Sequence, residues 1–461
     1  MSRRFGGASS SGRVPASHTA LAATPRPSRE VYAATGAGLE QWGDPFVDAD
    51  VVIVGAGLAG LRCARRLTEL GHEVVVLESS DGVGGRIRTD VVDGFRCDRG
   101  FQVLNPAYPA VRRWVDVSTL DLKPFGSGVL VRRTNGLQVL ADPVREPRLL
   151  AQTMRSGYLH PRELAGVTRW SARVMADPKT VLAQKDSTLA ESLDGAGVTG
   201  RLRREVLDPF LAGVLVDSHG GSSANFTKLL VRMFALGRPA VPATGMQALP
   251  EQVAKPLGDR VRLNSHVESI TPVPGGVDVM VDGQRLRARS AVVATDPIGA
   301  ATLTTLPEPP TKGLVTWWFD APEPPHSLPL VAVDGRRHDS VPPGPVWNTA
   351  VMTAAAPSYA PPTKHLVQAT CLLDRPDGDA SEADVLRHVG EIYGCDTTDW
   401  RVVTRHRVEA ALPAMTPPLE VRSPVTLGDG IFVCGDHRDT ASIQGALVSG
   451  QRAAEAVNAH L

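Results

Sequence analysis

The sequence predicts an α/β fold in which helices cover a buried parallel sheet. An apolar run at residues 51–54 leads into a glycine-rich turn at 55–60 and then into a helical repeat of apolar residues that ends at Gly71. A second apolar run ends at Glu78 and completes a βαβ unit. A short apolar run at 431–434 and a helical pattern at 443–459 place another strand and helix at the end of the chain.

Composition sets the broad class. The 461 residues are enough for two or three domains, and hydrophobic and charged fractions of 42% and 21% are those of a globular protein. A formal net charge of zero argues against a nucleic-acid partner, because phosphate binding requires a basic surface. No apolar run reaches the roughly 18 to 20 residues of a membrane-spanning helix, so we expect at most peripheral membrane contact.

The cysteines and the N-terminal residues bear on the cellular compartment of the protein. The five cysteines are scattered and show no CxxC spacing, so neither a disulfide framework nor a metal site is expected, and a cytoplasmic location is favoured. Residues 1–45 are predicted to be a disordered leader, since residues 1–29 carry five arginines and no acid in a Ser/Ala/Gly-rich background. An organelle transit peptide has the same character and stays an alternative.

The turn after the first strand has the pattern of a dinucleotide-binding site. Gly55 permits the tight turn out of the strand, Gly57 lets the backbone approach a pyrophosphate, and Gly60 lets the helix pack close to the strand. Leu58 and Ala59 begin the helix, whose N-terminus offers unpaired N–H groups and partial positive charge to phosphates. A Rossmann-type domain is therefore expected here.

The next two motifs distinguish among dinucleotides. Glu78 ends the second strand, where its carboxylate can accept both ribose hydroxyls and disfavours the 2′-phosphate of NADP. Gly84, Gly85 and Arg86 follow in a second glycine-rich loop, which brings backbone and a guanidinium towards the pyrophosphate. A strand near the end of the chain then delivers Gly435-Asp436 just before the last helix.

With these three segments the chain resembles the FAD-dependent superfamily of flavin amine oxidases, protoporphyrinogen oxidases and phytoene desaturases. The resemblance covers nearly everything after residue 48 and is closest to the phytoene desaturase-like branch. It also includes residues 209–214, 234–237, 242–249, 292–297 and 357–361.

The resemblance implies a fold and a set of cofactor contacts. A discontinuous FAD-binding domain would comprise residues 46–105, 240–298 and 410–461, and a mixed α+β substrate domain residues 106–239 and 299–409. Asp436 would bind the ribityl or phosphate part of FAD, Val267 would present its backbone to the adenine, and the helix beginning at Ile443 would point at the flavin pyrimidine ring. Cys434 is expected to be a buried strand residue, so FAD should be bound noncovalently.

The resemblance leaves the reaction open between branches. Amine oxidases have an aromatic pair that holds the amine and usually a lysine on a central strand. The corresponding positions here are Ser442-Ile443 and Thr316, with Lys312 nearby. We therefore expect a desaturase-like enzyme that oxidises an apolar, isoprenoid-like or tetrapyrrole-like substrate by hydride transfer to the flavin. A flavin amine oxidase, and an isomerase or binding protein that keeps FAD without net redox, remain alternatives.

No catalytic residue is assigned from the sequence. Trp317, Trp318 and Phe319 either line a substrate cavity or belong to the core, and core is favoured because alternate residues of a strand face opposite sides. His437 follows the last flavin motif and is expected to be a bystander. The substrate's identity, the electron acceptor and the oligomeric state do not follow from the sequence.

Overall fold

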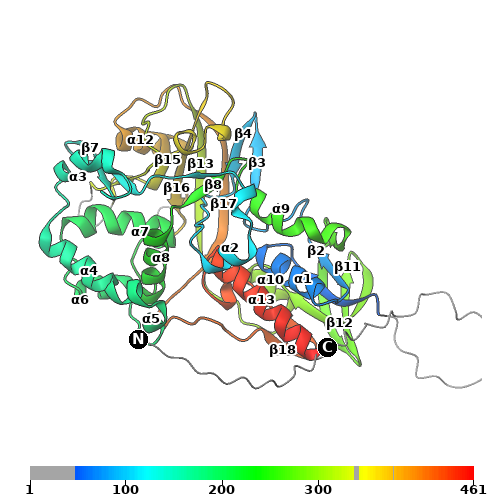
Figure 1. Ribbon diagram of the computed structural model, residues 1–461. Coiled ribbons are helices and arrows are strands. Elements are labelled where there is room, and N and C mark those ends of the chain that lie inside the picture. Colours follow the sequence, from blue (N-terminus) through cyan, green and yellow to red (C-terminus); the bar gives the residue numbers. More distant parts are fainter. Residues whose placement is uncertain (1–46, 337–341, 377) are drawn as a thin grey trace, which may run out of the picture. The chain divides into compact units, whose positions relative to one another are not determined.

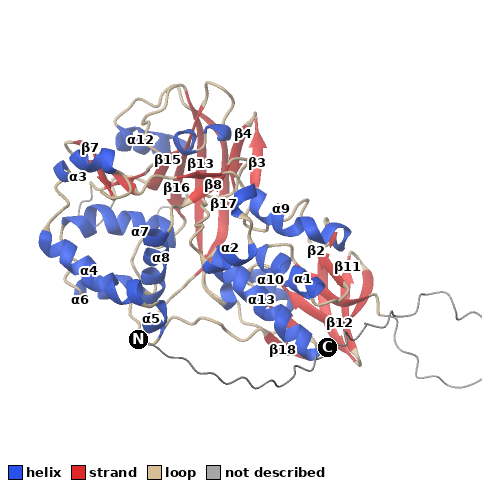
Figure 2. Cartoon of the chain, viewed as in Figure 1, coloured by secondary structure: helices blue, strands red, loops and turns tan. Residues whose placement is uncertain are grey.

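The computed structural model describes residues 47–336, 342–376 and 378–461 (Figure 1). The predicted leader, residues 1–45, lies outside the described residues. Two large sheets and the helices packed on them account for most of the rest (Figure 2). The predicted α/β class is confirmed.

The first sheet has eight strands, with β1 at its centre. β1 pairs in parallel with β2 on one side and with β12 on the other, and β12 also pairs in parallel with β19. The strands are β1 (Ala49–Val54), β2 (Val74–Leu77), β9 (Val261–Arg262), β10 (Val267–Val273), β11 (Gly276–Val281), β12 (Gln284–Val293), β18 (Thr426–Gly428) and β19 (Ile431–Val433). The apolar runs at 51–54 and 431–434 are therefore parallel strands, as predicted.

The alternating pattern of residues 261–270 predicts one continuous strand, and this prediction is wrong. Residues 261–270 form two strands, β9 and β10, which lie at opposite edges of the sheet. Between them Asn264 adopts a positive φ of 52°, and the backbone N–H groups of Asn264 and Ser265 donate to the carbonyls of Ser80 and Glu78. The chain thus turns against the end of β2, although no glycine or proline marks the turn.

Two helices pack side by side on the first sheet, α1 (Leu58–Glu69) and α13 (Ile443–His460) (Figures 1 and 2). Their contact is close because Gly450 lies against Ala59, where a Cβ at position 450 would come 2.1 Å from the Ala59 carbonyl oxygen. Ser442 caps α13 by accepting a hydrogen bond from the Gly445 N–H at 3.1 Å. The predicted helix at the chain end is confirmed, and Ser442 has a structural role.

The second sheet has seven strands, with β15 at its centre and β17 and β7 at its edges. All neighbours in it are antiparallel except β14 and β6. The strands are β6 (Gly128–Arg133), β7 (Gly136–Ala141), β13 (Thr311–Ala321), β14 (Val331–Asp334), β15 (Val346–Val351), β16 (His365–Leu372) and β17 (Arg401–Pro413). β17 continues past residue 409, which was the predicted end of the substrate domain.

The three aromatic residues of β13 belong to the core. Trp317 and Phe319 point to one face, where their rings stack with centroids 6.3 Å apart and Trp400 packs beside them. Trp318 points to the other face and belongs to the hydrophobic core that also contains buried residues of β1 and α1. All three side chains are buried. The core interpretation, rather than the cavity wall, is confirmed.

The remaining helices and two short ribbons complete the described chain. A break at residues 216–223 separates two of the helices, α7 and α8. The helices are α2 (Pro109–Trp114), α3 (Leu150–Arg155), α4 (Pro161–Ala176), α5 (Pro178–Leu182), α6 (Leu189–Gly195), α7 (Asp208–Leu215), α8 (Ala224–Leu236), α9 (Ala248–Ala254), α10 (Pro297–Leu303), α11 (Met352–Ala355) and α12 (Glu382–Tyr393); the ribbons are β3 (Thr89–Val92) with β4 (Phe95–Asp98) and β5 (Leu122–Pro124) with β8 (Ala240–Pro242). Within the described ranges, no helix combines the length and the apolar character required to cross a bilayer.

Candidate functional site

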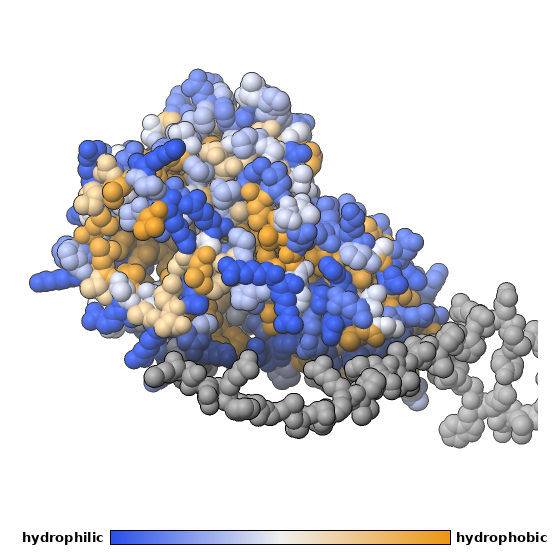
Figure 3. Space-filling model, in the orientation of Figure 1, coloured by the Kyte–Doolittle hydropathy of each residue, from blue (hydrophilic) through white to orange (hydrophobic). Residues whose placement is uncertain are grey.

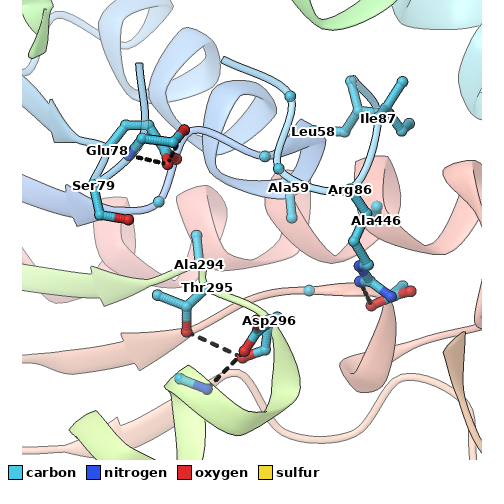
Figure 4. A pocket seen from close by; sticks show the side chains of 18 of the residues that line it. Leu58, Ala59, Glu78, Ser79, Arg86, Ile87, Ala294, Thr295, Asp296 and Ala446 are labelled. Carbon is cyan, nitrogen blue, oxygen red and sulfur yellow. Dashed lines mark hydrogen bonds and ion pairs between the residues drawn. The ribbon is translucent and has the colours of Figure 1, made fainter. Parts of the chain in front are cut away.

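A cavity of about 870 Å³ opens where the parallel strands of the first sheet end. Residues that follow the carboxyl ends of β1, β2, β12 and β19 line it, which is where open α/β sheets bind ligands. Figure 4 shows Glu78 and Arg86 on opposite sides of this cavity, with Thr295 and Asp296 between the two. We refer to it as the nucleotide cavity.

The glycine turn forms one wall of the nucleotide cavity. Gly55 has a φ of +106°, and a Cβ there would come 2.8 Å from the Ala294 carbonyl oxygen, so this turn requires glycine. A Cβ on Gly57 would meet no heavy atom within 4 Å, so the space beside Gly57 is open for a ligand. Gly60 packs against the Gly55 carbonyl oxygen, which a Cβ would approach to 2.1 Å.

Glu78 is fixed at the end of β2 by three hydrogen bonds. Its Oε2 accepts from the Ala56 N–H at 2.8 Å, and its Oε1 accepts from the N–H and hydroxyl of Ser80 at 2.9 and 2.7 Å. The side chain is only 8% exposed. A carboxylate has about four acceptor positions, so one remains for a ligand hydroxyl.

Arg86 joins the second glycine loop to the end of the chain. Its Nη2 lies 2.5 Å from Asp436 Oδ1, and its Nη1 donates to the Ala411 carbonyl at 2.9 Å. Burial alone would lower the pKa of Arg86, but the Asp436 carboxylate outweighs it and raises that pKa above its usual value. The structure therefore brings together two motifs that are 350 residues apart in the chain.

Nearly all the predicted cofactor-binding residues meet at this cavity. Of the set, only Gly60 does not line it, because it serves the packing of α1 on β1. The residues that line it are Gly55, Gly57, Leu58, Ala59, Glu78, Gly84, Gly85, Arg86, Val267, Gly435, Asp436 and Ile443. Their individual contacts with FAD stay a prediction.

A second cavity, of about 690 Å³, lies beside the nucleotide cavity. Aromatic and aliphatic side chains dominate its lining, including the edge-to-face pairs Phe101–Phe125 and Phe210–Phe234, with ring centroids 5.8 and 5.9 Å apart. We refer to it as the apolar cavity.

The two cavities share a wall. Both are lined by Arg86, Arg99, Gln102, Val103, Ala411 and Leu412. Molecules bound in the two cavities would therefore lie next to each other at these shared residues, which we call the junction. Close contact between two bound reactants is what electron transfer within a bound pair requires.

Three residues considered from the sequence lie outside both linings. The Lys312 ammonium is bound by Asp217 Oδ2 at 3.0 Å and Ser222 Oγ at 2.8 Å. Thr316 is fully buried in β13. His437 lies behind Gly435, and burial lowers its pKa to about 4. Among the residues that line either cavity in the described chain there is no lysine, tryptophan or tyrosine.

Sequence reasoning missed the apolar cavity and most of the junction. Phe210 and Phe234 lie in stretches that carry the family resemblance, but no local pattern marks either of them as a cavity residue. Arg99 and Gln102 follow the β3–β4 ribbon without a recognisable motif. The available signal was a stretch from Arg99 to Val103 that combines Arg, Gly, Phe and Gln directly after a strand.

The nucleotide cavity fits FAD in three respects. The open space at Gly57 allows a pyrophosphate close to the N-terminus of α1. The Glu78 carboxylate is fixed at the end of β2, where it can accept a hydrogen bond from a ribose hydroxyl. Ser442, Ile443 and Ala446 bring the first turn of α13 to the same cavity, where its partial positive charge can stabilise a reduced flavin.

Sequence comparisons place the chain among flavoproteins. The family model for flavin containing amine oxidoreductases matches residues 58–458. A putrescine oxidase from Kocuria rosea is 30% identical over 279 residues, which are 54% of this chain and 57% of the relative. A Mycobacterium tuberculosis protein provisionally named a flavin-containing monoamine oxidase is 29% identical over 278 residues, 55% of this chain and 58% of the relative. The chain thus spans less than two thirds of the length of these relatives.

Solved structures show the same fold. A protein from Exiguobacterium sp. 255-15, provisionally named a protoporphyrinogen oxidase, superposes with a TM-score of 0.64 at 18% identity, covering 90% of this chain and 99% of that one. Cyclohexylamine oxidase from Brevibacterium oxydans IH-35A gives a TM-score of 0.66 at 18% identity, with the same coverage.

The predictions of the superfamily, of FAD as the cofactor and of an oxidoreductase are confirmed by these matches. The desaturase-like branch is not singled out by them, and the family model extends over most of the chain. The chain belongs to the flavin containing amine oxidoreductase family.

Proposed function

We propose that this protein oxidises an apolar organic substrate bound in the apolar cavity, with noncovalent FAD in the nucleotide cavity. One observation carries the proposal: a largely hydrocarbon-lined cavity adjoins the predicted FAD site through a shared wall. FAD supplies the acceptor for a two-electron oxidation. The substrate class, isoprenoid-like or tetrapyrrole-like, follows the resemblance and the character of this lining.

The protein's own contribution is binding and orientation. The glycine turn, Glu78 and α13 would hold FAD, while the Arg86–Asp436 ion pair closes the cavity between the second glycine loop and the end of β19. The Phe101–Phe125 and Phe210–Phe234 pairs would hold the substrate by burying its hydrocarbon surface, at about 25 cal/mol per Å². They would also exclude water from the junction.

Noncovalent binding is supported by the placement of the cysteines. Cys434 directly precedes the flavin motif but is fully buried in the core, and no cysteine is among the described residues that line either cavity. Acid or heat denaturation should therefore release intact FAD into the supernatant. All five cysteines are free, which supports the proposal of a cytoplasmic location.

Amine oxidation is the second candidate, and the names of the relatives favour it. A protonated amine would need a carboxylate or an aromatic face in the cavity. The apolar cavity has one lining carboxylate, Asp142, which already accepts from the N–H groups of Val144 and Arg145 and pairs with the Arg145 guanidinium at 3.7 Å. With its one carboxylate already bound, the lining offers a protonated amine only the faces of its phenylalanine rings, so an uncharged reacting group is favoured.

Anaerobic flavin reduction tests the proposal. Polyenes, porphyrinogens and amines are mixed with the oxidised holoprotein at matched concentration, and the bleaching of the flavin absorbance is followed. Reduction by an apolar compound, with little or none by mono- and polyamines, is expected. Rapid reduction by an amine alone would establish the second candidate. Product formation without bleaching would point to an isomerase that keeps FAD without net redox.

We also propose that the protein contacts membranes peripherally, because an apolar substrate would partition into lipid. Exposed apolar side chains occur near the mouth of the apolar cavity: Val144 is 86% exposed, Met154 64%, Leu236 46% and Leu150 45%. Figure 3 shows apolar side chains gathered over α3 and α4, on the left of the view. The cavity reaches the surface in this region, since Ala235 lines it and is exposed.

A further inference from the structure

Arg99 is the residue of the junction whose side chain has a charged hydrogen-bond donor to spare. Arg86 uses Nη1 and Nη2 on Ala411 and Asp436. Gln102 donates its amide N–H groups to the carbonyls of Arg86 and Arg99, at 2.7 and 3.3 Å, and its Oε1 is a buried acceptor without a partner in the described chain, which does not attract an anion. Arg99 lines both cavities, and its side chain is 41% exposed.

The guanidinium of Arg99 is held by one edge only. Its Nε and Nη2 donate to Asp90 Oδ2 and Oδ1, both at 2.9 Å. Asp90 Oδ2 also accepts from His406 Nε2 at 2.9 Å, which ties the β3–β4 ribbon to β17 of the second sheet. These bonds fix the plane of the guanidinium and leave Nη1 without a partner in the described chain. The hydrogen bonds that Arg99 donates to Asp90 raise the pKa of Arg99, so its guanidinium stays charged.

A fixed, charged hydrogen-bond donor beside a hydrocarbon-lined cavity favours a ligand with one anionic group and an otherwise apolar body. A carboxylate is the group that guanidinium nitrogens bind best, through charge-assisted hydrogen bonds. The rest of such a ligand would lie against the phenylalanine pairs, where it needs no polar partner. Arg145, the third arginine at this cavity beside Arg86 and Arg99, is already bound to the carbonyls of Phe234, Ala235 and Gly237.

We infer that Arg99 is a specificity-determining residue, which binds the acidic group of an apolar carboxylic acid in the apolar cavity. Asp90 and His406 are positioning residues, which orient the Arg99 guanidinium. This inference rests on the proposed use of the apolar cavity for the substrate and narrows the substrate class to apolar acids.

The test compares two probes that differ only in charge, retinoate and methyl retinoate. Their binding to the FAD-loaded protein is measured by quenching of tryptophan fluorescence, with the flavin spectrum as a second readout. The wild-type protein should bind retinoate more tightly than the ester. Arg99→Met should weaken retinoate binding about tenfold or more, the usual effect of losing a hydrogen bond to a charged group, and change ester binding less than about twofold.

Arg287 provides a matched control. It forms the same bidentate pair, with Asp278 at 2.6 and 2.9 Å, but on β11 and β12 away from both cavities. Arg287→Met should keep the wild-type preference for retinoate. Asp90→Asn should lower the preference in part, because Arg99 keeps its charge but loses its orientation.

Three results would overturn the inference. The first is that the wild-type protein does not bind retinoate. The second is that Arg99→Met weakens the binding of retinoate and of methyl retinoate equally. The third is that Arg99→Met changes the flavin affinity or spectrum and keeps the preference for retinoate. The last would assign Arg99 to FAD. Binding does not require turnover, so a retinoate preference without flavin reduction by any apolar compound would retain this inference and reject the proposed reaction.

Discussion

Gly57 and Gly60 lie in the same turn, but a side chain would meet different surroundings at each. A leucine at 57 would extend into the open space of the nucleotide cavity, whereas an added methyl at 60 would collide with the Gly55 carbonyl oxygen. Gly57→Leu is therefore expected to fold with a near wild-type melting temperature and to purify without flavin. A variant with full flavin content would show that FAD does not pass Gly57.

Gly60→Ala is expected to act on stability instead. The clash between a Cβ and the Gly55 carbonyl must separate α1 from β1, which we expect to cost about 1–3 kcal/mol, as overpacking does elsewhere. Urea unfolding of both apoproteins measures the difference. If Gly60→Ala were as stable as the wild-type protein while losing flavin, the roles assigned to the two glycines would be exchanged.

His437 makes the stability of the folded protein depend on pH. Both of its ring nitrogens are buried without a partner in the described chain, and burial lowers its pKa to about 4, against about 6.5 when unfolded. Between these values the unfolded chain binds a proton that the folded protein does not, so stability should fall as the pH drops from 6.5 towards 4. The charges nearest the ring belong to Asp436, Arg438, Arg86 and Asp296.

The measurement is the free energy of unfolding at pH 7.5 and pH 5 for the wild-type protein and for His437→Leu. The loss between the two pH values should be smaller in the variant, by at most about 2 kcal/mol. The comparison uses the change with pH, so a constant packing effect of leucine cancels. Equal changes in both proteins would show that His437 titrates normally in the folded state.

At the scale of elements, Arg145 fastens the end of α8 beside the mouth of the apolar cavity. Its Nη1 donates to the carbonyls of Phe234 and Gly237 at 3.0 and 3.4 Å, and Nη2 donates to that of Ala235. Arg238 returns a hydrogen bond to the Arg145 carbonyl at 2.9 Å. A cation at the C-terminal carbonyls of a helix is also favoured by the helix dipole.

Arg145→Met should therefore destabilise the C-terminal end of α8 beside the opening of the apolar cavity. We expect a loss of about 1–2 kcal/mol in the free energy of unfolding, because charge-assisted bonds to carbonyls are lost, and faster dissociation of a bound apolar ligand in stopped-flow experiments. Arg148→Met is the control, since Arg148 is exposed in the same segment. Unchanged dissociation in Arg145→Met would mean that ligands enter elsewhere.

Features that a short stretch of sequence determines could be predicted from the sequence. Features that depend on contacts between residues distant in the chain could not. The turn at Gly55–Gly60, Glu78 and the capped α13 are encoded in short motifs. The split of residues 261–270 into β9 and β10 depends on backbone bonds to Ser80 and Glu78, which no local pattern shows. The apolar cavity is assembled from β6, α7, α8 and β17, so its lining is visible only in three dimensions.

At the scale of the whole molecule, the exposed apolar side chains near α3 predict a lipid-binding face. Arg148 and Arg155 are exposed there too and would favour anionic lipid. The wild-type protein should float with phosphatidylglycerol-containing vesicles, and the double variant Val144→Asp, Met154→Asp should float much less. Val91→Asp is the control, because Val91 is 68% exposed on the β3–β4 ribbon. Equal flotation of all three proteins would remove the membrane from the proposal.

The ion pair between Arg86 and Asp436 has a consequence for biosynthesis. A ribosome adds about 5–20 residues per second, and folding of the early segments starts before the late ones exist. The glycine turn and Glu78 emerge well before β19, Asp436 and α13, since Asp436 follows Arg86 by 350 residues. FAD would therefore be captured only after translation of the segment from Ile431 onward, and a nascent chain stalled before it should carry no flavin.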